Sequence, residues 1–249
     1  MMDGFGFPVG AGNFRFRAET VIVRRLLRDI EHEGAVLDLG SGVGCWAEEF
    51  ANNFSQVIAV EGSSALYEAL DERCGPILNI RTLHGNVLAF EPEGQYSLIF
   101  LGGLLMYLNE NDLITLLQKL RPYLEPEGII LCRESTVRGE TVTRTGDYPV
   151  VYRTVADYKR IFEQCGLTLK QVERNEPYVL MQMGCELIKK WKRVIPESIQ
   201  ALPVVGRLTY WGLRLGARGI KPLPKVLGIP FPNLENHFFV LRAEPSVHE

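Results

Sequence analysis

The sequence predicts an α/β fold in which a mostly parallel sheet carries helices on both faces. Strand-like apolar runs alternate with helical patterns along most of the chain. The first run, Val36 to Leu39, leads into a loop with glycine at three alternate positions, Gly40-Ser41-Gly42-Val43-Gly44. The next run ends in Glu61, about twenty residues after the loop. A glycine loop after a buried strand, and an acidic residue after the following strand, predict a nucleotide-binding half-sheet in which Glu61 holds a ribose.

The expected strands are short apolar runs bounded by glycine, proline or polar residues. They fall at residues 35–39, 56–61, 78–83, 96–101, 128–134, 167–172 and 237–242. The expected helices are segments in which apolar residues recur every three or four positions. They fall at residues 18–30, 44–53, 63–73, 110–121 and 154–165. Because strands and helices alternate with short loops, the strands are expected to be parallel.

The chain is expected to have three parts. Residues 1–33 form an N-terminal arm and helix, a lid or cap, in which the Gly- and Phe-rich residues 1–14 are an arm or tail and Gly34 ends the helix. Residues 34–174 and 236–249 form the core. Residues 175–235 form an insertion with helices at 181–195 and 200–216, followed by Pro222, Pro224, Pro230 and Pro232, which favour extended or turning chain.

The insertion is strongly basic. Segment 186–230 holds nine Lys or Arg residues and two acids, a net charge of +7 in a chain whose total is −3. Basic residues beside Trp191 and Trp211 are typical of a helix lying on a membrane surface. The same composition also fits a solvated cap, and exposed aromatic residues equally fit a dimer surface.

The glycine spacing distinguishes between nucleotides. A dinucleotide loop places its third glycine at position 45, where this chain has Cys45, and no Gly-Lys-Ser/Thr of a phosphate-binding loop follows. Asp-x-Gly-x-Gly-x-Gly, from Asp38 to Gly44, resembles the pattern of the S-adenosylmethionine-dependent methyltransferases, class I, with a Rossmann-like fold. The resemblance extends over about residues 17–174. It implies a seven-stranded sheet whose last strand inserts antiparallel between the two before it.

The resemblance implies that the chain binds S-adenosyl-L-methionine and releases S-adenosyl-L-homocysteine. Asp38 would reach the ammonium group of this methyl donor, and Glu61 would hold its ribose. Asn86 stands where many relatives carry an acidic residue at the adenine edge, and Ser97 replaces an acidic residue that is frequent early in their fourth strand. The expected donor site is Asp38, Gly40, Ser41, Gly42, Gly44, Glu61, Gly62, Ser63, Asn86, Val87, Leu101 and Gly102.

The methyl acceptor is expected beside the loops that follow the fourth and fifth strands. Tyr107 stands where many relatives carry an acceptor-facing residue. Glu134, at the end of the fifth strand, is a candidate base or acceptor anchor, with a salt bridge to Arg133 or Arg153 as the structural alternative. Tyr148 and Tyr152, in the polar loop after it, could form walls of the acceptor pocket or pack against the following helix.

Composition limits the alternatives. A net charge of −3 argues against a nucleic-acid partner, and the four histidines form no cluster that would suggest a metal site. The chain shows no signal peptide and no membrane span, and its five cysteines are widely spaced, so a cytoplasmic location is expected.

The favoured function is methyl transfer to an oxygen or nitrogen of a small molecule. One alternative is a methyltransferase at a membrane surface that acts on a lipid or a lipid-linked sugar. Another is a non-catalytic protein that binds S-adenosylmethionine, because fold alone does not prove chemistry. A dehydrogenase is disfavoured by Cys45 at the third-glycine position.

Overall fold

The computed structural model describes residues 9–30, 33–146, 148–179, 199, 203–220 and 233–244. The chain divides into two compact units. The sheet unit is Leu27–Arg174 with His237–Glu249, and the helical unit is Met1–Leu26 with Asn175–Asn236. The helix expected at 181–195 and the proline-rich stretch after position 221 lie outside the described residues.

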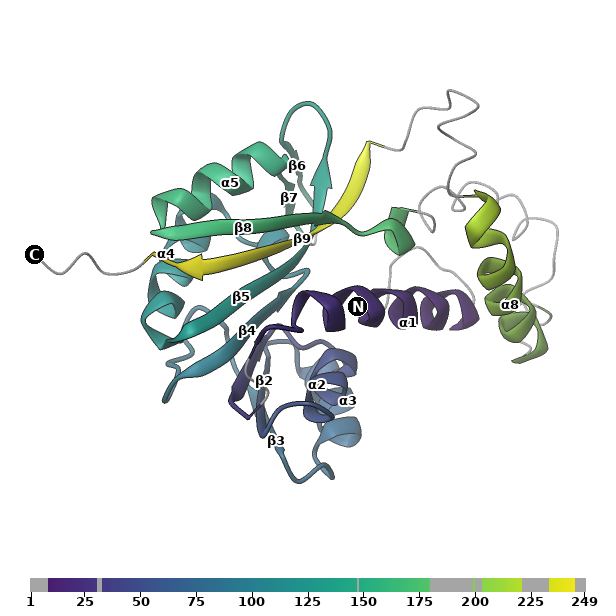
Figure 1. Ribbon diagram of the computed structural model, residues 1–249, viewed down its shortest axis with the longest axis horizontal. Coiled ribbons are helices and arrows are strands. Elements are labelled where there is room, and N and C mark those ends of the chain that lie inside the picture. Colours follow the sequence, from purple (N-terminus) through teal and green to yellow (C-terminus); the bar gives the residue numbers. More distant parts are fainter. Residues whose placement is uncertain are drawn as a thin grey trace, which may run out of the picture. The chain divides into compact units, whose positions relative to one another are not determined.

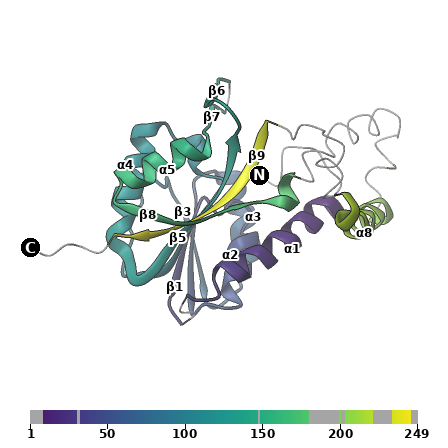
Figure 2. The same cartoon turned by 45° about the horizontal axis from the view of Figure 1, so that its top comes forward.

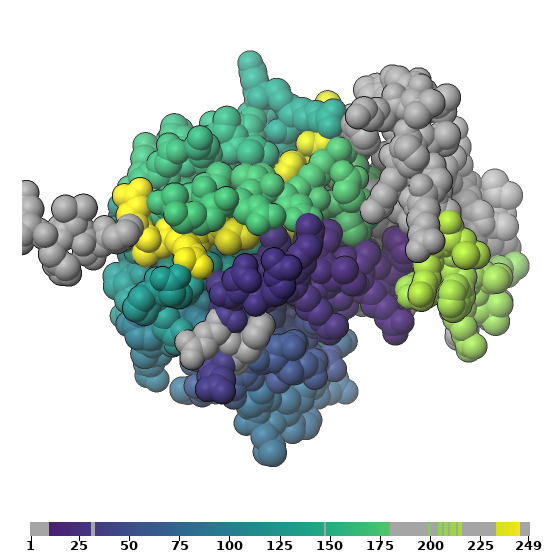
Figure 3. Space-filling view, viewed as in Figure 1, coloured from purple at the N-terminus to yellow at the C-terminus, as the bar shows by residue number. Residues whose placement is uncertain are grey.

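The sheet unit is built on a seven-stranded sheet with the order β3-β2-β1-β4-β5-β9-β8 (Figure 1). The strands are β1 (Ala35–Leu39), β2 (Gln56–Glu61), β3 (Ile80–His84), β4 (Tyr96–Gly102), β5 (Leu124–Val137), β8 (Leu167–Arg174) and β9 (Leu234–Ala243). The pairs among β1 to β5 are parallel, and β9 is antiparallel to β8. In the space-filling view, the surface of β9 emerges between green and teal atoms (Figure 3). The expected fold class, with the last strand inserted antiparallel, is confirmed.

The register brings the carboxyl ends of the central strands to one edge of the sheet. Asp38 of β1 is aligned with Ala59 of β2 and with Phe100 of β4. Because side chains alternate along each strand, Asp38 and Glu61 project from the same face. This edge therefore collects the glycine loop, Glu61 and the end of β4.

Helices cover both faces of the sheet. They are α2 (Cys45–Ala51), α3 (Ser64–Cys74), α4 (Glu110–Leu120) and α5 (Val155–Gln164). The apolar residues of α4 and α5 pack with the side chains of one sheet face in a single core cluster. On the opposite face, Phe50 of α2 meets Phe100 edge-on, with 5.1 Å between ring centroids. Figure 2 shows α4 and α5 together on one side of the sheet.

The polar loop expected after the fifth strand contains a small hairpin, formed by β6 (Val142–Arg144) and β7 (Val150–Tyr152). It stands out from the sheet unit in Figure 1. Beyond β7, Arg153 pairs with Thr136 of β5 in an isolated bridge, and the amide of Val137 donates to the Arg153 carbonyl at 3.1 Å. The hairpin was not predicted because all three residues of β6 are exposed and give no apolar alternation.

The helical unit contains α1 (Val9–Leu26) and α8 (Pro203–Ile220). These two helices contact each other, and both figures show them side by side (Figures 1 and 2). Phe14 and Tyr210 join them edge-on, with ring centroids 6.1 Å apart. The expectation of an arm at 1–14 is wrong for residues 9–14, which are helical, and the helix ends at Leu26 rather than near Gly34. In the described residues, no helix is long and apolar enough to cross a membrane.

A buried polar network joins the start and end of the insertion to α1. The amide of Asn175 donates to the carbonyl of Asn236 at 2.8 Å. The side-chain amide of Asn175 donates to Glu19 at 2.7 Å and to the Asn236 side chain at 2.8 Å. All three side chains are buried, so these hydrogen bonds replace water that the groups lose on folding.

Candidate functional site

The glycine loop forms a tight backbone turn at the end of β1. Gly40, Gly42 and Gly44 all have positive φ, a region that L-residues rarely adopt. A β-carbon at Gly44 would lie 2.6 Å from Cys74 Sγ and 2.7 Å from a methyl carbon of Leu70. The loop is therefore closed against α3 behind it, and its glycines are required by both dihedral angle and space.

Glu61 fixes this loop from the neighbouring strand. One carboxylate oxygen accepts a hydrogen bond from the amide of Gly42 at 2.8 Å, and the other accepts one from the amide of Ser63 at 2.8 Å. Each carboxylate oxygen has further acceptor capacity. Glu61 therefore has a structural task in the loop beyond the ribose contact expected for it.

Asp38 lies beneath the loop and is 1% exposed. Its Oδ2 has no hydrogen-bond partner among the described residues. Burial raises the pKa of Asp38 to about 7, the Ser41 hydroxyl opposes this rise, and the nearby Glu61 carboxylate adds to it. A buried carboxyl group with an open oxygen is costly without a partner, and a cation placed beside it would remove that cost.

The end of β4 faces the glycine loop. Gly103, with φ +80°, turns the chain into a short 3₁₀ helix, η1 (Leu105–Tyr107). A β-carbon at Gly40 would lie 3.2 Å from the Leu104 side chain. The turn after β4 thus packs directly on the loop, while Gly102 and Gly103 keep side chains away from this edge.

The end of β3 supplies further groups beside Glu61. His84 is aligned with Glu61, stacks on Tyr67 with ring centroids 5.0 Å apart, and has Nε2 3.3 Å from the Gly62 carbonyl. The side-chain oxygen of Asn86 accepts from the amide of Leu88 at 2.9 Å. Sequence reasoning missed His84 and Tyr67, although His84 directly precedes the Gly85-Asn86 pair that it singled out.

Other expected donor residues differ in their placement. Val87 is buried in the core cluster, and Gly62 and Ser63 form the bend that Glu61 holds. Leu101 also lies in the core cluster, on the sheet face opposite Phe100 and Asp38, so only its backbone reaches the site edge. Ser97 lies beside Gly34, at the far end of β4, so its replacement of an acidic residue does not alter this edge.

Glu134 is bound by backbone amides, and Arg133 lies near enough to lower the pKa of its carboxyl group. Its side chain is fully buried, and Oε1 accepts hydrogen bonds from the amides of Leu104 and Leu105 at 3.0 and 2.9 Å. Burial raises the pKa of Glu134 to about 7, and the amides of Leu105 and Leu104 oppose this rise. The carboxyl group thus anchors the turn after β4, which no sequence pattern indicated.

Arg153 holds the other end of the same turn. Its side chain is buried and donates to the carbonyl of Leu105 at 3.0 Å and to that of Leu108 at 2.7 Å. From the sequence, Arg153 is expected only as a salt-bridge partner for Glu134. Its burial between a hairpin and η1 depends on contacts distant in sequence.

The structure brings three of the four expected acceptor-side residues together. Tyr152 and Glu134 both lie close enough to Tyr107 to raise the pKa of its hydroxyl, although burial has the larger effect. Arg144 lies over the Tyr152 ring, 5.3 Å from its centroid. Tyr148, between β6 and β7, is 77% exposed and does not wall a pocket in this structure.

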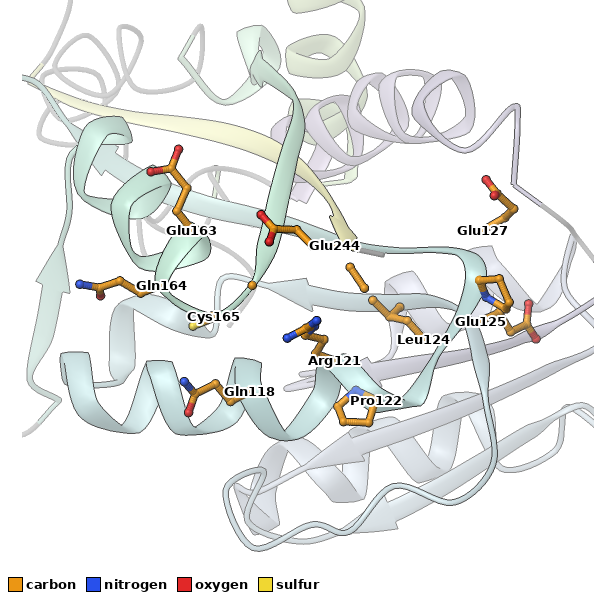
Figure 4. A pocket seen from close by; sticks show the side chains of 13 residues that line it. Gln118, Arg121, Pro122, Leu124, Glu125, Glu127, Glu163, Gln164, Cys165 and Glu244 are labelled. Atoms are coloured by element: carbon orange, nitrogen blue, oxygen red, sulfur yellow. The ribbon is translucent and has the colours of Figure 1, made fainter. Parts of the chain in front are cut away.

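A large pocket of about 1010 Å³ lies at the opposite end of the sheet (Figure 4). Arg121, Glu163 and Glu244 are among the residues that line it. These residues lie at the end of α4, the end of α5 and the end of β9. Ligands of open α/β sheets bind at the carboxyl ends of the parallel strands, so this pocket is not the candidate site.

The site edge suits an elongated ligand with a cation at one end and a diol further along. Asp38 offers an open buried oxygen, the loop offers backbone without side chains, and Glu61 offers acceptors for hydroxyl groups. The residues therefore fit a nucleoside that carries an amino-acid tail.

Comparison with known proteins finds similarity to methyltransferases. A family model described as a methyltransferase domain matches residues 36–128. Phosphoethanolamine N-methyltransferase 3 of Arabidopsis thaliana is 27% identical over 161 residues, which cover 64% of this chain and 32% of that protein. Ribosomal RNA small subunit methyltransferase A of Dehalococcoides mccartyi is 29% identical over 167 residues, covering 64% of this chain and 56% of that protein. The chain therefore spans between a third and about half of these curated relatives.

A solved structure extends the likeness in fold. The O-methyltransferase of a trans-AT polyketide synthase multienzyme from Brevibacillus brevis, in complex with S-adenosyl-L-homocysteine, has a TM-score of 0.63 at 14% identity. The match covers 97% of this chain and 82% of that one. From its sheet order and these matches, we conclude that the chain has the class I, Rossmann-like fold and that residues 36–128 are similar to the methyltransferase domain.

Proposed function

We propose that the protein binds S-adenosyl-L-methionine at the β1–β2 edge and transfers its methyl group to an oxygen or nitrogen of a small molecule. The observation that carries the proposal is the glycine loop, which Glu61 holds above the open, buried carboxyl group of Asp38. Asp38 would pair with the donor's ammonium group and Glu61 would accept from its ribose hydroxyls. The donor supplies the electrophilic methyl carbon, and S-adenosyl-L-homocysteine leaves.

The acceptor would lie beside Tyr107 and Tyr152. Methyl transfer requires alignment and exclusion of water more than a strong base, and aromatic walls provide both. The phosphoethanolamine N-methyltransferase among the relatives supports a small amine or alcohol as the acceptor class. Because another relative is named as a ribosomal RNA methyltransferase, a nucleic-acid acceptor is the alternative that should be tested beside small molecules. The turn after β4 reads Gly102-Gly103-Leu104-Leu105, without the Asn/Asp-Pro-Pro-Tyr tetrad that would hold a flipped base.

The first test is calorimetric titration with S-adenosyl-L-homocysteine. We expect micromolar binding by the wild type and loss of binding in Glu61→Ala and Gly42→Val. The matched controls are Glu93→Ala, which removes an exposed carboxylate, and Gly139→Val, whose glycine has φ +84° and open space around it. Absence of binding by folded wild-type protein would overturn the proposal. Binding without turnover across phenols, amines and lipid-linked sugars would favour a non-catalytic role.

We also propose a second candidate, a methyltransferase that works at an anionic membrane surface. The motivating observation is a stripe of exposed apolar residues along α8, at Val204, Leu208, Trp211 and Leu215, with exposed fractions of 59%, 67%, 52% and 77%. The spacing of four, three and four places them on one face of the helix. The sequence of α8 contains three arginines and no acid, which suits anionic lipid.

Vesicle flotation tests this second candidate. We expect the intact protein to float with vesicles of phosphatidylglycerol but not with phosphatidylcholine alone, and Leu208→Glu with Leu215→Glu to abolish flotation. The exposed Leu78→Glu substitution is a control on another part of the surface. No flotation by the wild type would rule the candidate out. A concentration-dependent dimer in light scattering that the same α8 substitutions dissolve would instead assign the stripe to a second copy.

We further propose that the protein is cytoplasmic. The four cysteines in the described residues, Cys45, Cys74, Cys132 and Cys165, are free thiols, which is the usual state in a reducing compartment.

A further inference from the structure

The turn from Leu104 to Leu108 connects the two halves of the candidate site. At its start, the Leu104 side chain lies where a β-carbon at Gly40 would touch it at 3.2 Å, so the turn rests on the donor loop. Near its end it carries Tyr107, which the acceptor is proposed to meet. Any movement of this turn would therefore change both the donor loop and the acceptor side.

Two buried side chains of opposite charge hold the turn. Glu134 accepts from the amides of Leu104 and Leu105, and Arg153 donates to the carbonyls of Leu105 and Leu108. Glu134 therefore binds the start of η1, while Arg153 binds its first residue, Leu105, and Leu108, the residue that directly follows it.

Burial of the Glu134 and Arg153 side chains costs folding free energy. Both side chains are almost fully buried, and Oε2 of Glu134 has no hydrogen-bond partner among the residues that the structure describes. A buried carboxyl group with an unused oxygen lowers stability unless its remaining hydrogen bonds offset the cost of burial. Here the other oxygen, Oε1, binds two amides of a five-residue turn that has little regular structure of its own.

We propose that Glu134 and Arg153 are positioning residues that fix the 104–108 turn, and through it the placement of Tyr107 toward the acceptor and of Leu104 on the glycine loop. The inference rests on the proposed function for its catalytic consequence. The clamp itself is a property of the fold that can be measured without any ligand.

The test is hydrogen exchange at the amides of Leu104 and Leu105, resolved to single residues by mass spectrometry. We expect these amides to exchange at least about tenfold faster in Glu134→Ala, the effect of losing charge-assisted hydrogen bonds. Glu134→Gln keeps an acceptor oxygen and should give an intermediate rate. Glu140→Ala, which removes an exposed carboxylate further along the same segment, is the matched control and should leave the rate unchanged.

The pH profile separates a clamp from simple packing. Between pH 6 and 8 the wild-type amides, corrected for intrinsic exchange, should become better protected as Glu134 ionises, and those of Glu134→Gln should show no such trend. Arg153→Lys, which keeps the charge but loses the forked geometry, should loosen Leu108 without abolishing the fold. Wild-type exchange rates in Glu134→Ala and Glu134→Gln would overturn the inference.

Donor binding is measured separately. Glu134→Gln should bind S-adenosyl-L-homocysteine within about twofold of wild type, because Gln keeps an acceptor oxygen for the Leu104 amide and Arg153 still holds the turn, while turnover of any acceptor found should fall in kcat more than in donor affinity. A wild type that fails to bind S-adenosyl-L-homocysteine would overturn the proposed function and leave the exchange result to decide the clamp. A kcat unchanged in Glu134→Gln would overturn the positioning role.

Discussion

The carboxyl groups of Asp38 and Glu61 stand at the ends of neighbouring strands, yet their surroundings differ. Glu61 is held by two backbone amides, whereas Asp38 is buried with one oxygen open. Hydrogen bonds from amides favour the ionised form of a carboxyl group, and burial without them disfavours it. The same chemical group thus holds a backbone loop in β2, whereas burial raises its pKa to about 7 in β1.

The raised pKa of Asp38 predicts pH-dependent donor binding. A ligand ammonium beside Asp38 would lower this pKa from about 7, so binding near neutral pH should release a proton and affinity should rise from pH 6 to pH 8. Asp38→Asn should bind about tenfold more weakly, without this pH dependence. Titration of S-adenosyl-L-homocysteine in buffers of different ionisation enthalpy measures the released proton. Equal proton release by Asp38→Asn would contradict the assignment.

The same pKa predicts a stability effect of opposite sign. A carboxyl group with a raised folded-state pKa favours the folded state at low pH, and this contribution is lost as pH rises from about 4 to about 7. The full loss is on the order of 4 kcal/mol. Asp38→Asn should therefore unfold at higher denaturant concentration than wild type at pH 8 and at a similar concentration at pH 4. A wild-type protein that is more stable at pH 8 than the variant would refute this.

At the scale of elements, the glycine loop is constrained by its helix as much as by its ligand. Gly44 precedes α2 with φ +81° and faces Cys74 and Leu70 of α3 at distances that exclude a β-carbon. Sequence spacing alone identifies this loop because dihedral angle and close approach both demand glycine. That is why the glycine loop could be located from the sequence, while the donor contacts expected around it stay predictions.

Gly44→Ala separates these two demands. We expect it to destabilise the protein by about 2–4 kcal/mol, because strain in φ adds to a clash with α3. Gly139→Ala, at nearly the same φ but with nothing within 4 Å of its β-carbon, should cost only about 1 kcal/mol. Thermal and urea unfolding of both variants gives the difference. Equal losses would show that backbone strain, and not packing, sets the requirement at position 44.

Elements with a buried face were predicted within a few residues, and those without one were missed. The strands β1 and β2 have the expected limits because their apolar runs are almost wholly buried. The hairpin of β6 and β7 is held by backbone pairing, which leaves no signal in an exposed sequence such as Val142–Arg144. Helix α1 begins early because Gly10 and Ala11 are buried, where small size outweighs poor helix propensity.

The role of Glu134 shows a different limit. The sequence pointed to Glu134 as a candidate base or acceptor anchor, but its hydrogen-bond partners are backbone amides about thirty positions earlier in the chain. Any residue type can supply a backbone amide, so no side-chain pattern announces such a contact. Residues on the acceptor side can therefore be predicted from sequence only as candidates, because their contacts with the 104–108 turn depend on the fold.

At the scale of the whole molecule, the chain folds as two units, and each unit is formed by two separate segments of the sequence. The helical unit is assembled from an N-terminal helix and a segment that enters between β8 and β9. Composition indicated the second part, because segment 186–230 concentrates basic residues. Its association with α1 depends on Glu19, Asn175 and Asn236, whose pairing is not visible in sequence.

Asn175→Ala should disrupt the buried hydrogen-bond network of Glu19, Asn175 and Asn236. It removes hydrogen bonds to Glu19 and Asn236 from a buried network, a cost of about 2–4 kcal/mol for the helical unit. Limited proteolysis should then cut within residues 1–26 and 175–236 faster than in wild type. Gln171→Ala, at an exposed position of β8, is the matched control. Unchanged cleavage in Asn175→Ala would show that the network contributes little.

The pairing of Asn175 with Asn236 continues the antiparallel ladder of β8 and β9 by one more rung, after Arg174 and His237. The chain thus leaves the sheet after Arg174 and returns at His237, and the two ends of the intervening segment are hydrogen-bonded to each other through Asn175 and Asn236. Whatever is threaded between them can be lengthened, exchanged or replaced by a simple hairpin turn with little effect on the register of the strands. The junction between Asn175 and Asn236 is therefore a suitable place for protein engineers to graft another segment.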